Sequence, residues 1–234
     1  MGHPDNETHA LLRLVSLGHE AAAARLLNLH RKRLKKMIAC RIDQEVAARH
    51  DPSDVVQETI LTAASKLPEY LKQQDVPFYA WLRRLAWLRL VELHRQHLER
   101  GRGEASKADF RQGWLTSKSL SELVRRFGPT LPGEDNSAPS PSQTDGGNKA
   151  AAGGDSAAKA APLSRKAKGR IASALNRLEP GVRELLLLYY VEQLTVPEIA
   201  SVMNLETAQV KLRHMRAIRR MHALLEHPDE EPHL

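Results

Sequence analysis

The stretch from residue 194 to residue 226 constrains the fold more than any other part of the sequence, because it predicts two helices joined by a tight turn. Thr195 is a suitable N-cap for the first, short helix. Asn204 suits the turn, since asparagine accepts left-handed backbone dihedral angles. The second helix is expected to begin at Glu206 or Thr207. This is the pattern of a helix-turn-helix, a motif that places its second helix in the major groove of DNA.

The second helix of this motif has one apolar face and one basic face. Val210, Ala217 and Met221 recur at helical spacing and are expected to pack inward. No acidic residue occurs between positions 207 and 225. Arginine and lysine can pair with phosphate oxygens or guanine, and glutamine can bond adenine, although an ordinary solvated basic face is the alternative. The candidate contacts to duplex DNA are Thr207, Gln209, Lys211, Arg213, Arg216 and Arg220.

Composition narrows the classes of function. The formal net charge of +7 favours a polyanionic partner. The single cysteine, Cys40, excludes an intramolecular disulfide and is expected on a buried helix face. The histidines lack metal-ligand spacing, and the sequence contains no nucleophile–base pair or glycine-rich phosphate loop, so we expect no metal, no cofactor and no catalytic residue. No apolar run approaches the roughly 20 residues of a membrane span, and a secretory signal is absent, which predicts a cytoplasmic protein without a membrane partner.

The pattern along the chain predicts an all-α protein with two helical domains and a linker. Residues 6–100 read as helices, and the helix that starts at Asp51 is expected to end at Pro68. Residues 101–163 form the predicted linker, with a short amphipathic helix at 119–127. Most of the linker is too rich in Ala, Gly, Pro and Ser to fold and is expected to be disordered. Residues 164–227 form the second domain, which contains the helix-turn-helix.

Two polar features stand out in the first domain. Asp54, Gln57 and Glu58 share the polar face of one helix, which suggests a protein partner with a positive surface. On the helix from 78 to 100, Trp87 projects close to Arg83 and Arg84. A tryptophan beside guanidinium groups can stack on an unpaired base, or it can pack under a neighbouring segment, and the sequence leaves both alternatives open. Tyr70 and the polar turn after it, from Lys72 to Val76, could frame a pocket for such a base.

Several of these segments resemble bacterial sigma factors. The run Asp54-Val55-Val56-Gln57-Glu58-Thr59-Ile60-Leu61 resembles the signature "DxVQExFL" of the segment that docks on core RNA polymerase. Phe78-Tyr79-Ala80-Trp81-Leu82-Arg83-Arg84-Leu85-Ala86 resembles the promoter-melting motif "FxxWLxxIA". Pro197-Glu198-Ile199-Ala200 and Val210-Lys211 with Arg213 are similar to the "EIA" and "VKSRLxRA" motifs of the family's second DNA-binding region. Without a third domain between the two blocks, the chain is similar to the extracytoplasmic-function group.

The resemblance implies a region 2 domain at 6–100 and a region 4 domain at 164–227. Core RNA polymerase would be bound through the clamp helices of its largest subunit and the flap of its second subunit. The residues implied for polymerase binding are Asp54, Gln57 and Glu58. Those implied for the melted −10 element of promoter DNA are Tyr70, Lys72, Gln73, Arg83, Arg84 and Trp87. Those implied for the −35 duplex are Thr207, Gln209, Lys211, Arg213, Arg216 and Arg220. Control by an anti-sigma factor is left open.

This sequence also departs from the family pattern. Trp87 and Leu88 replace an arginine and an asparagine of the melting helix, and Leu212 stands where a serine is common. Two other classes of function therefore stay open. One is a helix-turn-helix regulator that acts without binding core polymerase, and such regulators usually read palindromes as dimers. The other is a basic RNA-binding or architectural protein, which would bind with steep salt dependence and little sequence preference.

Overall fold

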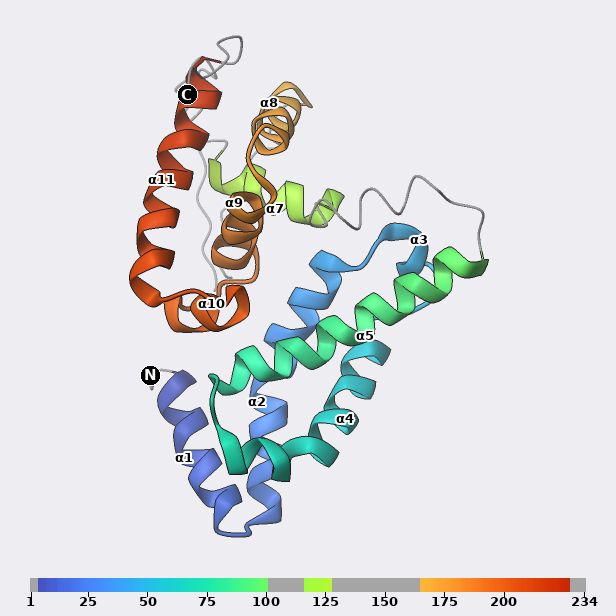
Figure 1. Cartoon of the computed structure of the whole chain (residues 1–234). Coiled ribbons are helices and arrows are strands. Elements are labelled where there is room, and N and C mark those ends of the chain that lie inside the picture. Colours follow the sequence, from blue (N-terminus) through green and yellow to red (C-terminus); the bar gives the residue numbers. More distant parts are fainter. Residues whose placement is uncertain (1–3, 101–115, 128–164, 228–234) are drawn as a thin grey trace, which may run out of the picture.

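The structure is a computed structural model that describes residues 4–100, 116–127 and 165–227 (Figure 1). Within these ranges all regular secondary structure is helical, which confirms the predicted all-α class. The part of the linker predicted to be disordered, residues 129–162, lies outside the residues that the structure describes. We refer to residues 4–100 as the N-terminal unit, and to residues 116–127 together with 165–227 as the C-terminal unit.

The N-terminal unit is built from helices whose ends follow local sequence signals. Gly18 turns the chain between the first two helices with φ of 87°, a backbone conformation that glycine adopts without steric cost. Asp51 caps the fourth helix by accepting a hydrogen bond from the Ser53 backbone N–H at 2.6 Å, and Pro52 occupies the first turn. The helices are α1 (Pro4–Ser16), α2 (Glu20–Arg41), α3 (Gln44–Ala47), α4 (Pro52–Gln73) and α5 (Phe78–Arg100).

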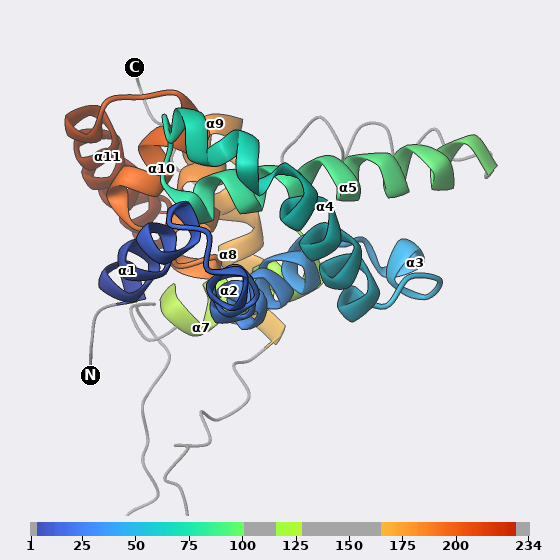
Figure 2. The same cartoon turned by 90° about the horizontal axis from the view of Figure 1, so that it is seen from below.

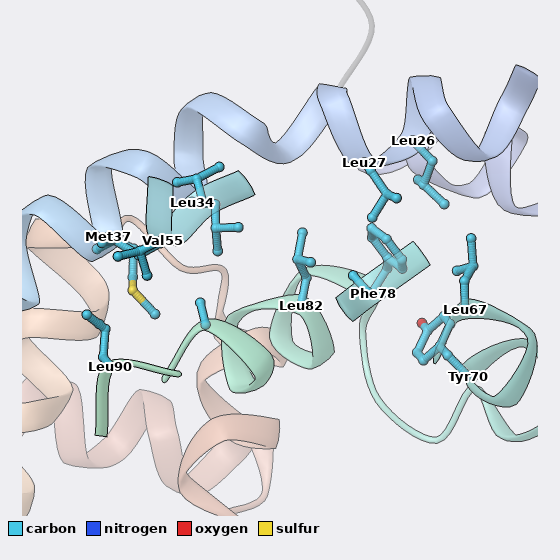
Figure 3. Close-up of a cluster of buried hydrophobic side chains, with 14 of the residues drawn as sticks. Leu26, Leu27, Leu34, Met37, Val55, Leu67, Tyr70, Phe78, Leu82 and Leu90 are labelled. Carbon is cyan, nitrogen blue, oxygen red and sulfur yellow. The ribbon is translucent and has the colours of Figure 1, made fainter. Parts of the chain in front are cut away.

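The core of this unit lies where α2, α4 and α5 meet (Figure 3). Leu34 from α2 and Leu82 from α5 are fully buried, and Leu67 from α4 is almost so. The apolar residues spaced along α2, α4 and α5 pack into this core as predicted, whereas Leu14 and Leu17 of the first helix are exposed. Helix α2 contacts α1, α4 and α5, and Figure 2 shows it below α5.

The prediction that α4 ends at Pro68 was wrong, because α4 continues through this proline to Gln73. Proline lacks an N–H and costs about 3 kcal/mol in a helix interior. Here Leu67 and Tyr70, on either side of the proline, are both buried in the core, whereas Pro68 faces solvent. The packing of its neighbours outweighs the local penalty, and the helix ends only where Gln74 takes a left-handed conformation.

The C-terminal unit contains the predicted helix at 119–127, which buries Leu123, Val124 and Phe127 against the rest of the unit. A π-helical turn, which the sequence did not predict, lies directly before Glu192. The helices are α7 (Ser117–Phe127), α8 (Arg165–Asn176), α9 (Pro180–Leu186), η2 (Leu187–Val191), α10 (Val196–Met203) and α11 (Thr207–Glu226).

The two units pack against each other. Tyr79 of α5 is buried in an apolar cluster whose other members, including Leu188 and Ile199, belong to the C-terminal unit. Cys40, near the end of α2, joins the cluster that contains Leu123 of α7, which confirms the packing role expected for this cysteine. In Figure 1, the N-terminal part of α5 lies next to α10, where the two units meet.

The first prediction concerns the core. Leu34→Ala should lower the free energy of unfolding by about 2–5 kcal/mol, because it removes buried methyl groups and leaves a cavity. The same substitution at Leu17, which is 75% exposed, should change it by less than about 0.5 kcal/mol. Chemical denaturation followed by circular dichroism measures both. Equal effects at the two positions would show that Leu34 is not part of a packed core.

Candidate nucleic-acid interface

The turn between α10 and α11 has the geometry predicted for a helix-turn-helix. Asn204 adopts the left-handed conformation, with φ of 51° and ψ of 53°, and the Leu205 backbone N–H bonds to the Ala200 carbonyl at 2.9 Å. Thr195 precedes α10 as its N-cap, and its N–H donates to the Glu198 carboxylate at 2.7 Å. These contacts fix the direction in which α11 leaves the turn.

Helix α11 has the two faces that the sequence predicted. Val210, Ala217 and Met221 are buried against the C-terminal unit. The opposite face is exposed, and its cationic side chains form no ion pair with any other residue that the structure describes. The exposed candidate contacts are Thr207, Gln209, Lys211, Arg213, Arg216 and Arg220. Of these, Gln209 also accepts a weak hydrogen bond from the Glu206 N–H at 3.4 Å.

Two apolar side chains stand among these polar groups. Leu212 is 44% exposed and Met215 is 53% exposed, both on the outer face of α11. They lie outside the buried stripe formed by Val210, Ala217 and Met221. Apolar side chains on such a face can contact the methyl group of thymine in the major groove.

The polar face of α4 is exposed as predicted, but it is partly paired. Gln57 accepts a hydrogen bond from Arg31 of α2 at 2.7 Å. Glu58 pairs with Arg89 of α5 at 2.6 Å, and Asp54 points to solvent near the start of the helix. The face therefore presents carboxylate and amide groups whose positions are held by neighbouring arginines.

The residues predicted to frame a pocket for an unpaired base differ in burial: one is buried and two are exposed. Tyr70 is only 7% exposed, and its hydroxyl donates to the Val76 carbonyl at 2.9 Å. Its ring lies 4.7 Å from that of Trp81, and burial raises its pKa to about 12. Lys72 and Gln73 are exposed. Tyr70 therefore shapes the loop from inside, while Lys72 and Gln73 form its surface.

The three residues expected near an unpaired base lie in different environments. Arg84 is exposed, whereas Trp87 is half-buried, with the guanidinium carbon of Arg83 5.5 Å from its ring centre. Arg83 itself is buried and paired with a carboxylate of the C-terminal unit. Of the two alternatives for Trp87, this arrangement corresponds to packing beneath a neighbouring segment.

A cluster of charges that the sequence did not reveal joins the units. Glu192 accepts hydrogen bonds from Nε of Arg41 at 2.6 Å and from Nη2 of Arg83 at 3.0 Å. Arg41 also binds both oxygens of Glu184, each at 2.9 Å. We call these four residues the arginine–glutamate cluster. At its edge, Arg33 holds Glu198 with two bonds of 2.8 and 2.6 Å.

The Glu192 carboxylate stays ionised at neutral pH, because its pKa is well below 7. Burial raises the pKa of Glu192, but the guanidiniums of Arg83 and Arg41 more than offset burial and lower it from 4.5 to about 2. The carboxylates in turn raise the pKa of Arg83. Because the pKa of Glu192 is lower in the folded chain than in the unfolded chain, its contribution to stability is present above pH 4.5 and is lost as the pH falls toward 2.

Two kinds of site are absent from the part of the chain that the structure describes. Its histidines, cysteine and carboxylates form no group that could hold a metal ion. None of its helices combines the length and the apolar character needed to cross a membrane.

The comparisons with known proteins agree with this geometry. Residues 168–221, which include the helix-turn-helix, match the family described as sigma-70, region 4. The chain is 27% identical over 181 residues to the RNA polymerase sigma factor CnrH of Cupriavidus metallidurans, covering 77% of this chain and 76% of CnrH. The chain is therefore similar to an RNA polymerase sigma factor over about three quarters of its length, and its helix-turn-helix matches region 4 of the sigma-70 family. A solved structure of CnrH in complex with the cytosolic domain of CnrY aligns with this chain at a TM-score of 0.47 and 21% identity, covering 96% of this chain and 99% of that chain.

The second prediction concerns the turn of the region 4 motif. Asn204→Val should destabilise the protein by about 1–2 kcal/mol, because a β-branched residue is strained at positive φ. Asn204→Gly removes the same side chain without this strain and should cost little. Thermal denaturation compares the two variants. A loss as large for glycine as for valine would mean that the asparagine side chain, rather than its backbone conformation, matters.

Proposed function

We propose that this chain is an alternative sigma factor of the extracytoplasmic-function type, which binds core RNA polymerase and directs initiation at particular promoters. The observation that carries the proposal is the exposed cationic face of α11, in a helix-turn-helix that matches sigma-70 region 4. Its mechanism is binding alone, since no bond is made or broken. We accordingly propose no catalytic residue, and a cytoplasmic location, where core polymerase and promoter DNA are found.

For the −35 element, α11 would enter the major groove of duplex DNA. Thr207, Gln209 and Lys211 lie near its N-terminal end, which in this motif faces the base edges. Arg213, Arg216 and Arg220 are further along the helix and would pair with backbone phosphates. Phosphate pairing supplies affinity, and the residues at the helix start supply the sequence preference.

For the −10 element, the exposed groups around α5 would hold a melted strand. Lys72, Gln73 and Arg84 are on the surface and can bind its backbone or bases. Arg83 is buried and paired with Glu192, and Trp87 is half-buried, so we assign these two a supporting position behind the exposed groups. Because Tyr70 is buried and bonded to Val76, we assign it the role of positioning this loop rather than contacting a base.

The proposed partners are core polymerase, promoter DNA and an anti-sigma factor. Asp54, Gln57 and Glu58 would contact the clamp helices of the largest subunit, since exposed acidic and amide groups suit a basic partner surface. The C-terminal unit would contact the flap of the second subunit. An anti-sigma factor is proposed as the regulatory partner. A regulator independent of polymerase is not favoured, because the helix-turn-helix matches a region of sigma factors.

The direct test of this function is run-off transcription. Purified chain is added to core polymerase on a genomic DNA library, and the start sites are mapped. Start sites that appear only with the chain, and that share sequence near −35 and −10, would support the proposal. Transcription identical to that of core polymerase alone would reject it.

The third prediction tests polymerase docking. Asp54→Lys combined with Glu58→Lys should abolish co-purification with core polymerase, because both exposed carboxylates become cations facing a basic surface. The matched control reverses two exposed carboxylates elsewhere, Glu7→Lys with Glu20→Lys, for the same change in net charge. Circular dichroism verifies that both variants fold. Retention of core polymerase by the first variant would remove α4 as the docking face.

The fourth prediction tests the −35 reader. Arg213→Ala and Arg216→Ala should each weaken duplex binding by about 1–3 kcal/mol and reduce its salt dependence, because each loses one contact to DNA. Arg13→Ala and Arg25→Ala change exposed arginines of α1 and α2 and should leave binding unaltered. Fluorescence anisotropy at several salt concentrations measures both effects. Equal losses in the two sets would mean that the effect comes from net charge rather than from α11.

A further inference from the structure

A short apolar strip lies at the centre of the outer face of α11. Ala208, Leu212 and Met215 are spaced by four and by three residues, so they project from the same side of the helix. All three are exposed, whereas the buried stripe through Val210 and Ala217 lies on the opposite side. We call Ala208, Leu212 and Met215 the apolar strip. It takes no part in the core, and Figure 1 shows α11 along the outer side of the C-terminal unit.

Polar and cationic side chains border the apolar strip. At about 100° per residue, Lys211 lies along one edge of the strip, and Gln209 and Arg216 lie along the other. Arg219 continues the line of the strip toward the end of the helix. None of these cations pairs with a carboxylate in the part of the chain that the structure describes. The outer face of α11 therefore has an apolar middle and a charged rim.

The major groove of duplex DNA has a matching arrangement. Its walls are phosphate backbones, and at its floor each thymine presents an apolar methyl group. The groove is about 12 Å wide and admits an α-helix. An apolar protein surface would leave the cations at the edges of the strip without opposite charges, whereas the groove offers phosphates to them. Duplex DNA is therefore the partner that suits both the middle and the rim of this face.

The apolar strip also lies toward the end of α11 that meets the bases. The helix begins at Thr207, so all three residues of the strip fall in its N-terminal half. In a helix-turn-helix, the N-terminal residues of the second helix contact base edges. Leu212 and Met215 are separated by about 4.5 Å along the helix axis, and base pairs are stacked about 3.4 Å apart. The two side chains can therefore reach adjacent base pairs, or pairs one step apart.

An apolar side chain in this position distinguishes thymine from the other bases. Cytosine carries an amino donor and no methyl group, and the purine edges carry acceptors. A leucine or methionine packed on such a polar group would remove its water without supplying a hydrogen bond, which is unfavourable. Contact with a thymine methyl group is favourable because both surfaces leave water.

We propose that Leu212 and Met215 set the sequence preference of the −35 contact by packing on thymine methyl groups in the major groove. The inference rests on the proposed function, because it requires α11 to enter duplex DNA. It adds the chemical identity of the bases, namely two thymines on adjacent base pairs or on pairs one step apart. Gln209 and Lys211, on either side of the strip, can read further base edges.

The test replaces thymine by uracil, which lacks the methyl group and keeps the same hydrogen-bonding atoms. The full chain first selects its preferred duplexes from a random-sequence library, so the target is found without polymerase. Each thymine of the selected site is then changed to uracil in turn, and fluorescence anisotropy measures the dissociation constant. The protein variants are Leu212→Ala and Met215→Ala. The matched control is Leu17→Ala, because Leu17 is an exposed leucine outside the C-terminal unit.

Uracil at each of two positions should weaken binding of the unaltered chain about fourfold, the factor expected when one buried methyl group is lost. Each α11 variant should lose the sensitivity to uracil at one of these positions, and Leu17→Ala should keep both. The loss should be the same at low and at high salt, because no phosphate contact is removed. Equal binding of thymine and uracil at every position would overturn the proposal, as would unchanged sensitivity in both α11 variants.

The outcomes separate this proposal from the proposed function. If selection returns no common sequence, α11 does not read duplex DNA, and both fail. If a common sequence appears but does not respond to uracil, α11 reads DNA through other groups, and only the thymine contacts are rejected. Both variants are expected to fold, because the positions are exposed and alanine is the strongest helix former. Circular dichroism checks this, and the uracil series on the unaltered chain needs no variant.

Discussion

The pairing of Glu192 with Arg41 and Arg83 determines how the rest of the structure is arranged. Burying a charged group costs several kcal/mol unless a partner of opposite charge satisfies it. Glu192 is fully buried, and its partners come from two different helices of the other unit. If Glu192 lost its contacts with Arg41 and Arg83, all three charged groups would need water or another ion as a partner. The paired charges therefore hold the two units together at this contact.

A local irregularity places Glu192 in this position. Through residues 187–191 the chain follows a π-helical turn, and the Glu192 N–H bonds to the Leu187 carbonyl at 3.0 Å, five residues back. Gln193 then takes a positive φ of 57°. The wider turn sets the direction of the Glu192 side chain, which reaches α2 and α5. π-helical turns are rare and are frequently found at functional sites, and here one orients the residue that links the two units.

Sequence reasoning succeeded where the cause is local and failed where it is not. The cap at Asp51, the left-handed Asn204 and the two faces of α11 follow from residue type and spacing, and the structure confirms them. Pro68 was misread because distant packing outweighs its local effect. The pair Arg83–Glu192 joins residues 109 positions apart, and no periodicity links them. Hence the exposed α11 site was predictable, whereas the burial of Arg83 required the tertiary structure.

The surface proposed for single-stranded DNA and the surface proposed for duplex DNA differ in exposure and in selectivity. Stacking and cationic groups for single strands are tolerant of sequence, so an open site of this kind would bind any unpaired nucleic acid. In a chain of net charge +7 that risk is large. The proposed α11 face would instead discriminate through base edges, and it is exposed. In this structure Arg83 is buried and Trp87 half-buried against the C-terminal unit, whereas the outer face of α11 is exposed.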